Sequence, residues 1–203
     1  MIANIFLLLL ISGFSLGDKN VVVVAANGFE EIELVTCVDV LRRAGAKVTI
    51  ASVGEESTTV IGSQNLTIVA DRKLLSYEEV QDAIVLPGGW TGSLNMANSA
   101  DLGALLKLYE KRDSYVAAIC AAPMALNAHE VFRGKKLTSY PGIKKELQGN
   151  YTYSEEPVVV DGKLLTSRGP GTAFQFAFKL VELLFGNKKV SQLEKGMLFQ
   201  QEN

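Results

Sequence analysis

Cys120 is the residue of this chain that is best suited to nucleophilic chemistry. It lies in the stretch AAICAAP, and Pro123, which closes this stretch, suits the first turn of a helix. A nucleophile on a sharp strand-to-helix turn needs small residues two positions away on either side, and here these are Ala118 and Ala122. A helix N-terminus behind the sulfur would favour the thiolate. The same pattern also fits a buried structural cysteine, which leaves both interpretations open.

Glu33, rather than a histidine, is the expected proton-transfer partner of Cys120. The only histidine, His129, lies nine residues after Cys120 on the same predicted helix, which places it about 13–14 Å away. A Cys-His-Asp triad is therefore disfavoured, and His129 is expected at the surface or at a helix end. Glu33 belongs to the stretch GFEEIE, where a partly buried carboxyl group would have a raised pKa and act as general acid or base. A buried polar anchor is the alternative role for Glu33.

Glycine-rich stretches at two other predicted strand ends are candidate parts of the same site. In LPGGW, Gly88 and Gly89 allow backbone N–H groups to approach a ligand closely. We expect the N–H groups of Gly89 and Ala121 to form an oxyanion hole, although a simple tight turn would also require glycine. In SRGPG, which first indicates a turn, Arg168 is expected to order an acidic cluster or to contact a second copy of the chain.

These candidates follow strands of a predicted α/β domain. Apolar runs predict strands, and apolar residues at helical spacing predict helices. The alternation of the two predicts a doubly wound, mostly parallel sheet with helices on both faces, in which ligands bind at the carboxyl ends of the strands. The predicted strands are 20–26, 47–53, 82–89 and 115–120, with short strands in 58–70 and a hairpin turning at Asp161-Gly162, and the predicted helices are 29–44, 99–112, 121–132, 172–186 and 188–195.

Composition excludes several classes of function. The chain has 203 residues and a formal net charge of −2, and no basic stripe indicates a nucleic-acid partner. Its two cysteines, Cys37 and Cys120, are too few for a disulfide scaffold, and no Cys/His cluster indicates a metal site. We therefore expect one globular domain, residues 18–203, that works without a metal.

Residues 1–17 are a candidate signal peptide or an apolar N-terminal extension. They carry no charge, and their apolar run is too short to span a bilayer, so no transmembrane helix is expected. Small residues before Asp18 suit cleavage, whereas the absence of Lys and Arg does not. The interpretation as a signal peptide predicts entry into the secretory pathway. The sequons at Asn65 and Asn150 add little, because about one sequon is expected by chance.

Taken together, several stretches resemble the ThiJ/PfpI superfamily, and most closely its Parkinson-disease-associated branch. They follow one another over nearly the whole of residues 19–198, and as a set they are far more specific than any one motif. The matching stretches are GFEEIE, VDVLRRAGAKVT, VLPGG, AAICAAP, YTYSE, DGKLLTSRGPGT and KLVELL.

The resemblance implies a flavodoxin-like single domain that forms a homodimer. It also implies an oxidation-sensitive Cys120, with Glu33 as its hydrogen-bond partner and an oxyanion site at Gly89 and Ala121. The activity implied is a cofactor-free glyoxalase and deglycase that acts on methylglyoxal and its early adducts and protects against oxidative stress. A redox-sensing chaperone with weak catalysis, in which Cys120 becomes a sulfinate, is the alternative. Relatives without a leader imply a cytoplasmic, mitochondrial or nuclear location instead of a secretory one.

Two departures from the superfamily pattern affect these expectations. Many relatives carry a histidine where this chain has Tyr140, and a tyrosine with an ordinary pKa near 10 is a poor base at neutral pH, although it can donate a hydrogen bond. The protease-like branch has a histidine directly after its cysteine, where this chain has Ala121, so peptidase activity is disfavoured. A hydrolase of the glutamine-amidotransferase type is disfavoured in the same way, because it also needs a histidine.

Overall fold

The computed structural model describes residues 18–54, 57–75 and 79–199, so the predicted leader lies outside the described residues. The strands are β1 Asn20–Ala26, β2 Lys47–Val53, β3 Thr59–Ile61, β4 Thr67–Val69, β5 Arg72–Lys73, β6 Ala83–Leu86, β7 Tyr115–Ile119, β8 Lys136–Leu137, β9 Thr152–Tyr153, β10 Val158–Asp161 and β11 Leu164–Ser167. The helices are α1 Glu31–Ala44, α2 Trp90–Ala97, α3 Ala100–Lys111, α4 Pro123–Ala128, α5 Lys144–Leu147, α6 Ala173–Phe185 and α7 Asn187–Gly196, with 3₁₀ turns at Pro141–Ile143 and Pro170–Thr172.

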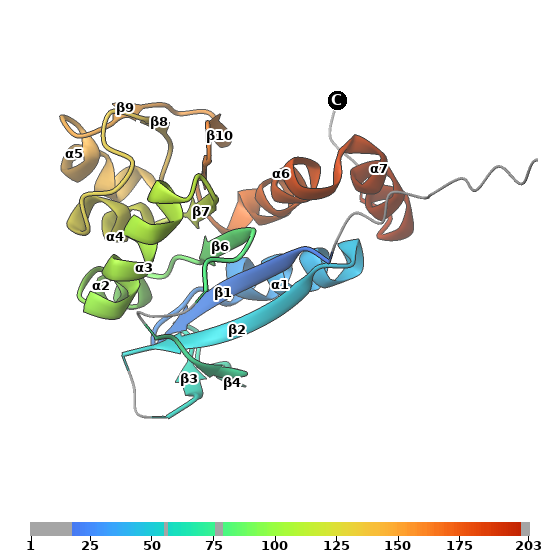
Figure 1. Ribbon diagram of the computed structural model, residues 1–203, viewed down its shortest axis with the longest axis horizontal. Helices are drawn as coiled ribbons and strands as arrows, with labels where there is room; N and C mark the ends of the chain where they lie inside the picture. The colour runs from blue at the N-terminus through green and yellow to red at the C-terminus, as the bar shows by residue number, and fades with distance from the viewer. Residues whose placement is uncertain (1–17, 55–56, 76–78, 200–203) are drawn as a thin grey trace, which may run out of the picture.

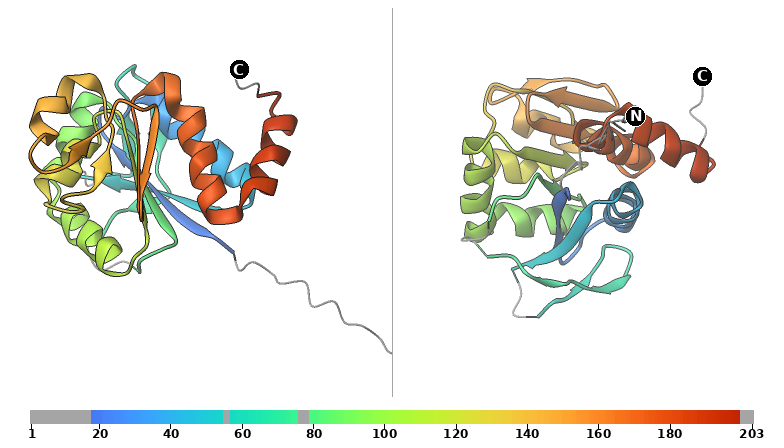
Figure 2. Two further views of the ribbon diagram at one scale, coloured as in Figure 1. Left: turned by 90° about the horizontal axis from the view of Figure 1, so that it is seen from above. Right: turned by 45° about the vertical axis from the view of Figure 1, so that its right-hand side comes forward.

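A central sheet of seven strands organises the domain, in the order β10-β11-β7-β6-β1-β2-β5. The neighbouring pairs in this order run parallel, except that β10 pairs antiparallel with β11. Helices cover both faces: α1, α6 and α7 gather on one side and α2 to α5 on the other (Figures 1 and 2). The predicted single, mostly parallel α/β domain is therefore confirmed.

Apolar residues that are buried on both faces explain why β1 and the strands beside it occupy the middle of the sheet. The side chains of β1 from Val21 to Ala26 and those of β6 from Ala83 to Leu86 are all buried. A strand buried on both faces must be covered by helices, because neither face can be left to water.

The β10–β11 hairpin turns at Gly162, which has a φ of 65° and follows Asp161, as the Asp-Gly pair predicts.

One local prediction near the middle of the chain was wrong, and one helix was not predicted. The helix expected over 121–132 spans only Pro123–Ala128, because Glu130 and Phe132 adopt positive φ angles of 60° and 56° that a helix cannot continue through. The helix that was not predicted is α2, which begins directly after Gly89. This helix has eight residues with a glycine and a β-branched threonine among its first three, so its propensity signal is weak.

Among the described residues, none of the helices has both the length and the apolar character required for a membrane span.

Candidate active site

Cys120 lies at a strained turn between β7 and α4. It is the first residue after the strand and has a φ of 63°, in the left-handed region that side chains other than glycine rarely adopt. Its N–H donates to the Ser167 carbonyl at 3.0 Å, and its own carbonyl accepts the N–H of Tyr140 at 2.8 Å. Backbone hydrogen bonds to both its N–H and its carbonyl therefore hold the strained residue in place. The thiol is nearly enclosed, with 8% of the residue exposed.

Glu33 is completely buried in the first turn of α1. Its Oε2 accepts the N–H of Gly88 at 2.6 Å, and its own N–H donates to the Glu30 carboxylate at 2.8 Å. Its other oxygen, Oε1, receives no N–H or hydroxyl donor from the described residues. Burial raises the pKa of Glu33 to about 8 although the Gly88 N–H opposes the shift, and the charge of Glu30 raises this pKa further. Glu33 therefore keeps its proton at neutral pH.

The Glu33 carboxyl group and the Cys120 thiol interact directly, which requires a correction to the expected thiolate. Burial first, and then the charge of an ionised Glu33, raise the pKa of Cys120 to about 12, while the N–H groups of Gly89 and Ala121 lower it. The contribution from α4 is limited, because this helix has six residues and begins three positions after the sulfur. The repulsion exists only while Glu33 is ionised. At neutral pH each group of the resting pair therefore carries its own proton, and protonated Glu33 opposes a thiolate less than ionised Glu33 does.

Glycine is required at position 88 because the thiol and the carboxyl group both approach its backbone. A Cβ atom added to Gly88 would lie 2.6 Å from the Cβ of Cys120 and 2.8 Å from Oε2 of Glu33. Gly89 has a φ of 86°, and an added Cβ would collide with the Gly28 carbonyl. The close approach directs the N–H of Gly88 to Glu33 and that of Gly89 to Cys120. The structure thus brings together five of the seven residues expected at the site, Cys120, Glu33, Gly88, Gly89 and Ala121, whereas the side chains of Tyr140 and Arg168 only border it.

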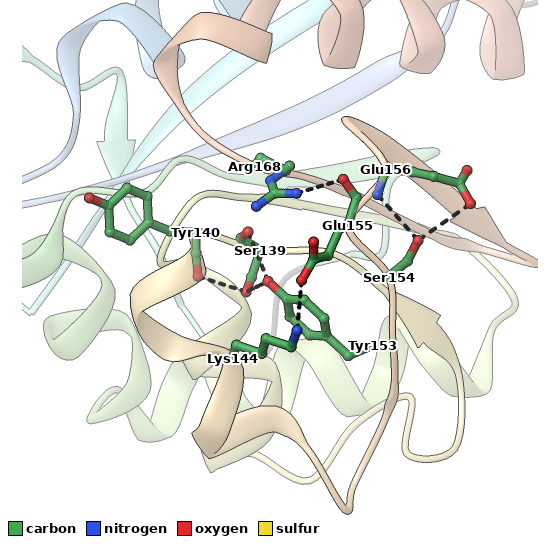
Figure 3. Close-up of polar contacts among 8 residues, drawn as sticks. All are labelled: Ser139, Tyr140, Lys144, Tyr153, Ser154, Glu155, Glu156 and Arg168. Atoms are coloured by element: carbon green, nitrogen blue, oxygen red, sulfur yellow. Dashed lines mark hydrogen bonds and ion pairs between the residues drawn. The ribbon is translucent and has the colours of Figure 1, made fainter.

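Tyr140 and Arg168 border this group without placing their polar side-chain atoms against the sulfur. Tyr140 contacts Cys120 through its backbone N–H, whereas its side chain is 49% exposed. Figure 3 shows its ring directed away from the hydrogen-bonded pair Ser139 and Tyr153. Arg168 donates to the backbone carbonyl oxygen of Glu155 at 2.6 Å (Figure 3). The pKa of the Glu155 side-chain carboxyl group is lowered first by Lys144 and, to a smaller extent, by the charge of Arg168.

His129 is the C-terminal cap of α4, which confirms its expected position at a helix end. Its Nε2 lies 2.9 Å from the Met96 carbonyl, and its ring packs against Gly103 of α3. It is directed at α2 and α3 and not at Cys120. Among the described residues, no three His, Cys, Asp or Glu side chains gather as a metal site would require.

Two supporting contacts were missed in the sequence. The carbonyl of Ser167 fixes the Cys120 turn, and no side-chain pattern indicates a backbone acceptor. Glu30 is the N-cap of α1 and orients Glu33 by accepting its N–H. The spacing of Glu30 three residues before Glu33 was a usable signal, because an N-cap side chain commonly accepts the third N–H of a helix.

Comparison with known proteins places this geometry in a family. Residues 19–183 match the profile of the DJ-1/PfpI family. Protein dj-1beta of Drosophila melanogaster is 46% identical over 184 residues, which cover 89% of this chain and 97% of that protein. A glutathione-independent glyoxalase of Caenorhabditis elegans, DJR-1.2, is 37% identical over 83% of this chain and 89% of its own length.

Solved structures agree with the sequence comparison. The crystal structure of Drosophila melanogaster DJ-1beta superposes with a TM-score of 0.87 at 44% identity and covers 91% of this chain and 100% of that one. A structure described as oxidized DJ-1 of Toxoplasma gondii has a TM-score of 0.85 at 35% identity, over 90% of this chain and 100% of that one. Since both the sequence and the fold agree along nearly the whole domain, the chain belongs to the DJ-1/PfpI family.

Proposed function

We propose that this protein is a glutathione-independent glyoxalase that converts methylglyoxal and related small 2-oxoaldehydes into 2-hydroxyacids. The observation that carries the proposal is the Glu33 carboxyl group, which holds a proton beside the Cys120 thiol and keeps one buried oxygen free of N–H and hydroxyl donors. A group of this kind can move protons without competing structural bonds. The glyoxalase named among the relatives supports the same assignment.

In the first step the Cys120 thiol releases its proton to solvent while Glu33 stays protonated, and the thiolate attacks the aldehyde carbon to form a carbon–sulfur bond. The carbonyl π bond breaks and its oxygen takes the proton from Glu33, which gives a neutral hemithioacetal and leaves Glu33 as a carboxylate. The N–H groups of Gly89 and Ala121, which point at the sulfur in the free protein, lie where they would stabilise the developing oxyanion.

In the second step the Glu33 carboxylate removes the proton from the former aldehyde carbon. The hydroxyl proton on the first oxygen moves to the neighbouring carbonyl oxygen, which leaves an enediolate with its charge on the first oxygen. Return of the proton to the neighbouring carbon gives a 2-hydroxyacyl thioester: the first carbon is oxidised, the second is reduced, and no external oxidant is needed. Water then cleaves the thioester and releases the 2-hydroxyacid and the thiol. Glutathione is not required because Cys120 replaces its thiol. Early adducts of 2-oxoaldehydes with amines or thiols release free aldehyde, so the same site would also act as a deglycase.

Lactate production from methylglyoxal in the absence of glutathione tests the proposal. We expect the purified chain to form lactate, and a purified chain that consumes methylglyoxal without forming lactate would contradict the mechanism.

A redox-sensing chaperone is the second candidate function, and the strained cysteine beside a protonated acid favours it. Two equivalents of peroxide would convert the thiol to a sulfinate, whose oxygens could accept the Glu33 proton and the N–H groups of Gly89 and Ala121. The related structure described as oxidized supports this possibility. We expect mild peroxide to add two oxygen atoms at Cys120, as measured by intact-mass and peptide analysis. If Cys120 resisted peroxide while the chain still produced lactate, the redox-sensing function would be contradicted and the glyoxalase function would remain.

We also propose that the protein is a homodimer. Ile32 and Val35 of α1 are 53% and 47% exposed, and Leu66, beside β4, is 45% exposed. The Glu31 carboxylate joins these surfaces by accepting a hydrogen bond from Ser63 at 3.0 Å. An exposed apolar surface that α1 and the segment around Leu66 form together is typical of a protein–protein interface.

The double substitution Ile32→Glu and Val35→Glu is expected to convert the dimer to a monomer, because a dimer would bury the new charges unpaired. Light scattering coupled to gel filtration measures this change. Leu198→Glu, at an 87% exposed position on the C-terminal segment, is the matched control and should leave the dimer intact. A monomeric parent chain would contradict the proposal.

A further inference from the structure

A solvent-open cavity of about 250 Å³ lies beside the residues that hold the Cys120 turn and is lined by Tyr140 and Arg168, which border the site described above. Its lining includes Tyr140, Pro141 and Pro170, and Arg168 is the only charged residue in it. The backbone of Cys120 is bonded on one side to Tyr140 and on the other to Ser167, the residue before Arg168. Two residues of the lining, Tyr140 and Arg168, therefore lie at or next to the backbone groups that bond Cys120.

Arg168 lines this cavity and commits one of its side-chain donors to another described residue. A guanidinium group has five N–H donors, and within the described part of the chain one side-chain bond is formed, from Nη1 to the Glu155 carbonyl. The two neighbouring carboxylates already have cationic partners, since Glu155 binds Lys144 at 2.7 Å and Glu156 binds Lys136 at 2.9 Å. Figure 3 shows the first of these partners together with Arg168. The arginine is thus available to an incoming anion.

The other residues that line the cavity are apolar or have side-chain hydrogen-bonding groups that are already paired. The Thr172 hydroxyl contacts Ser167 Oγ at 2.7 Å and accepts the N–H groups of Arg168 and Gly169, so it has no capacity left for a ligand. The proline rings and the half-exposed Tyr140 ring offer flat apolar contact surfaces. At about 250 Å³ the space is smaller than typical pockets for complete ligands, roughly 300–1,000 Å³, and it suits one substituent of a substrate.

We infer that this cavity is a substrate subsite for 2-oxoaldehydes whose substituent is flat or aliphatic and ends in a carboxylate. The aldehyde would reach Cys120, the apolar part would lie against Tyr140 and the prolines, and the carboxylate would accept N–H groups from Arg168. A methyl group, as in methylglyoxal, would leave the cavity empty. The inference rests on the proposed glyoxalase function for its chemistry, but a binding experiment without turnover tests it.

The test compares 4-carboxybenzaldehyde with 4-formylbenzamide, which has the same shape but no charge. Both form reversible hemithioacetals with a thiol, and neither can rearrange to an acid because neither has a 2-oxo group. Calorimetric titration gives their dissociation constants. We expect the parent chain to bind the acid roughly 10–100-fold more tightly than the amide, as a charge-assisted hydrogen bond would provide.

Arg168→Met should remove this preference, and Arg168→Lys should keep part of it. Arg133→Met, the same change at an exposed arginine paired with Glu130, should retain the full preference. Amide binding by the Arg168→Met variant shows that the cavity has kept its shape. If that variant binds neither aldehyde, the preference for the acid over the amide in the parent chain and in Arg168→Lys tests the inference instead. Equal affinity of the parent chain for the two aldehydes, no binding of either, or a preference that survives Arg168→Met would each overturn the inference. If the chain formed no lactate from methylglyoxal, the proposed glyoxalase function would fail, but the binding comparison of the two aldehydes would still test the cavity.

Discussion

Replacing Cys120 by serine is expected to lower kcat/KM for methylglyoxal by roughly 10³-fold or more, because the hydroxyl group cannot replace the thiol as a nucleophile. The substitution keeps the side chain nearly the same size, which matters at a turn with a φ of 63° and 8% exposure. The N–H groups of Gly89 and Ala121 and the proton on Glu33 remain in place, so the loss measures the sulfur itself. Lactate formed from methylglyoxal is the measurement.

Cys37→Ala provides the matched control, because Cys37 is the other cysteine and is completely buried in α1. We expect this variant to keep most of the lactate-forming activity, although the small cavity lowers stability somewhat. Unchanged turnover in Cys120→Ser would contradict the proposed mechanism. If both variants folded and both lost turnover, Cys37 would also be needed for activity, and its assignment as a residue without a role in turnover would be wrong.

Much of the fold could be predicted from the sequence because burial leaves a direct pattern. The run of Val21 to Val24 is apolar on both faces, and such a strand has to lie inside a sheet that is covered by helices. The extent of the helix after Cys120 could not be predicted in the same way, since His129, Glu130 and Val131 continue an acceptable helical composition. The helix ends where the backbone turns to a positive φ at Glu130, and that choice depends on tertiary contacts such as the bond from Phe132 N–H to Glu110.

The members of the candidate site could be predicted, but the state of its thiol could not. Cys120, Gly88 and Glu33 follow three different strands, and parallel strands present their carboxyl ends at one edge. The acidity of the thiol depends instead on how completely the pair is buried and on which N–H groups reach it. The sequence indicated a helix dipole that favours the thiolate, whereas burial and the neighbouring carboxyl group act more strongly in the opposite direction.

Replacing Glu33 by glutamine is expected to abolish turnover and, at the same time, to remove a pH-dependent loss of stability. The pKa of Glu33 is about 8 in the folded chain, against a reference value of 4.5. Between these two pH values the unfolded chain has released the proton and the folded chain retains it, so the free energy of unfolding falls as pH rises. A difference of about 3.5 units at 1.36 kcal/mol per unit sets an upper limit of about 5 kcal/mol for this loss.

Glutamine suits the position because its amide is neutral and its oxygen can still accept the N–H of Gly88. Urea unfolding at pH 5 and pH 8 should show the parent chain losing more stability between these conditions than Glu33→Gln does. The difference between the two proteins isolates Glu33, since Glu30, whose pKa burial also raises, is present in both. Glu130→Gln removes an exposed carboxylate and should behave like the parent chain.

The two readouts together separate a catalytic acid from a structural anchor. An anchor replaced by a good isostere would keep its activity, whereas loss of a general acid and base costs roughly 10²–10⁴-fold in turnover. We therefore expect Glu33→Gln to be folded, to be less sensitive to pH than the parent chain, and to form almost no lactate. A variant that forms lactate at the parent rate would show that Glu33 is only a buried hydrogen-bond acceptor for Gly88. Equal pH dependence in the two proteins would show that Glu33 does not keep its proton between pH 5 and 8.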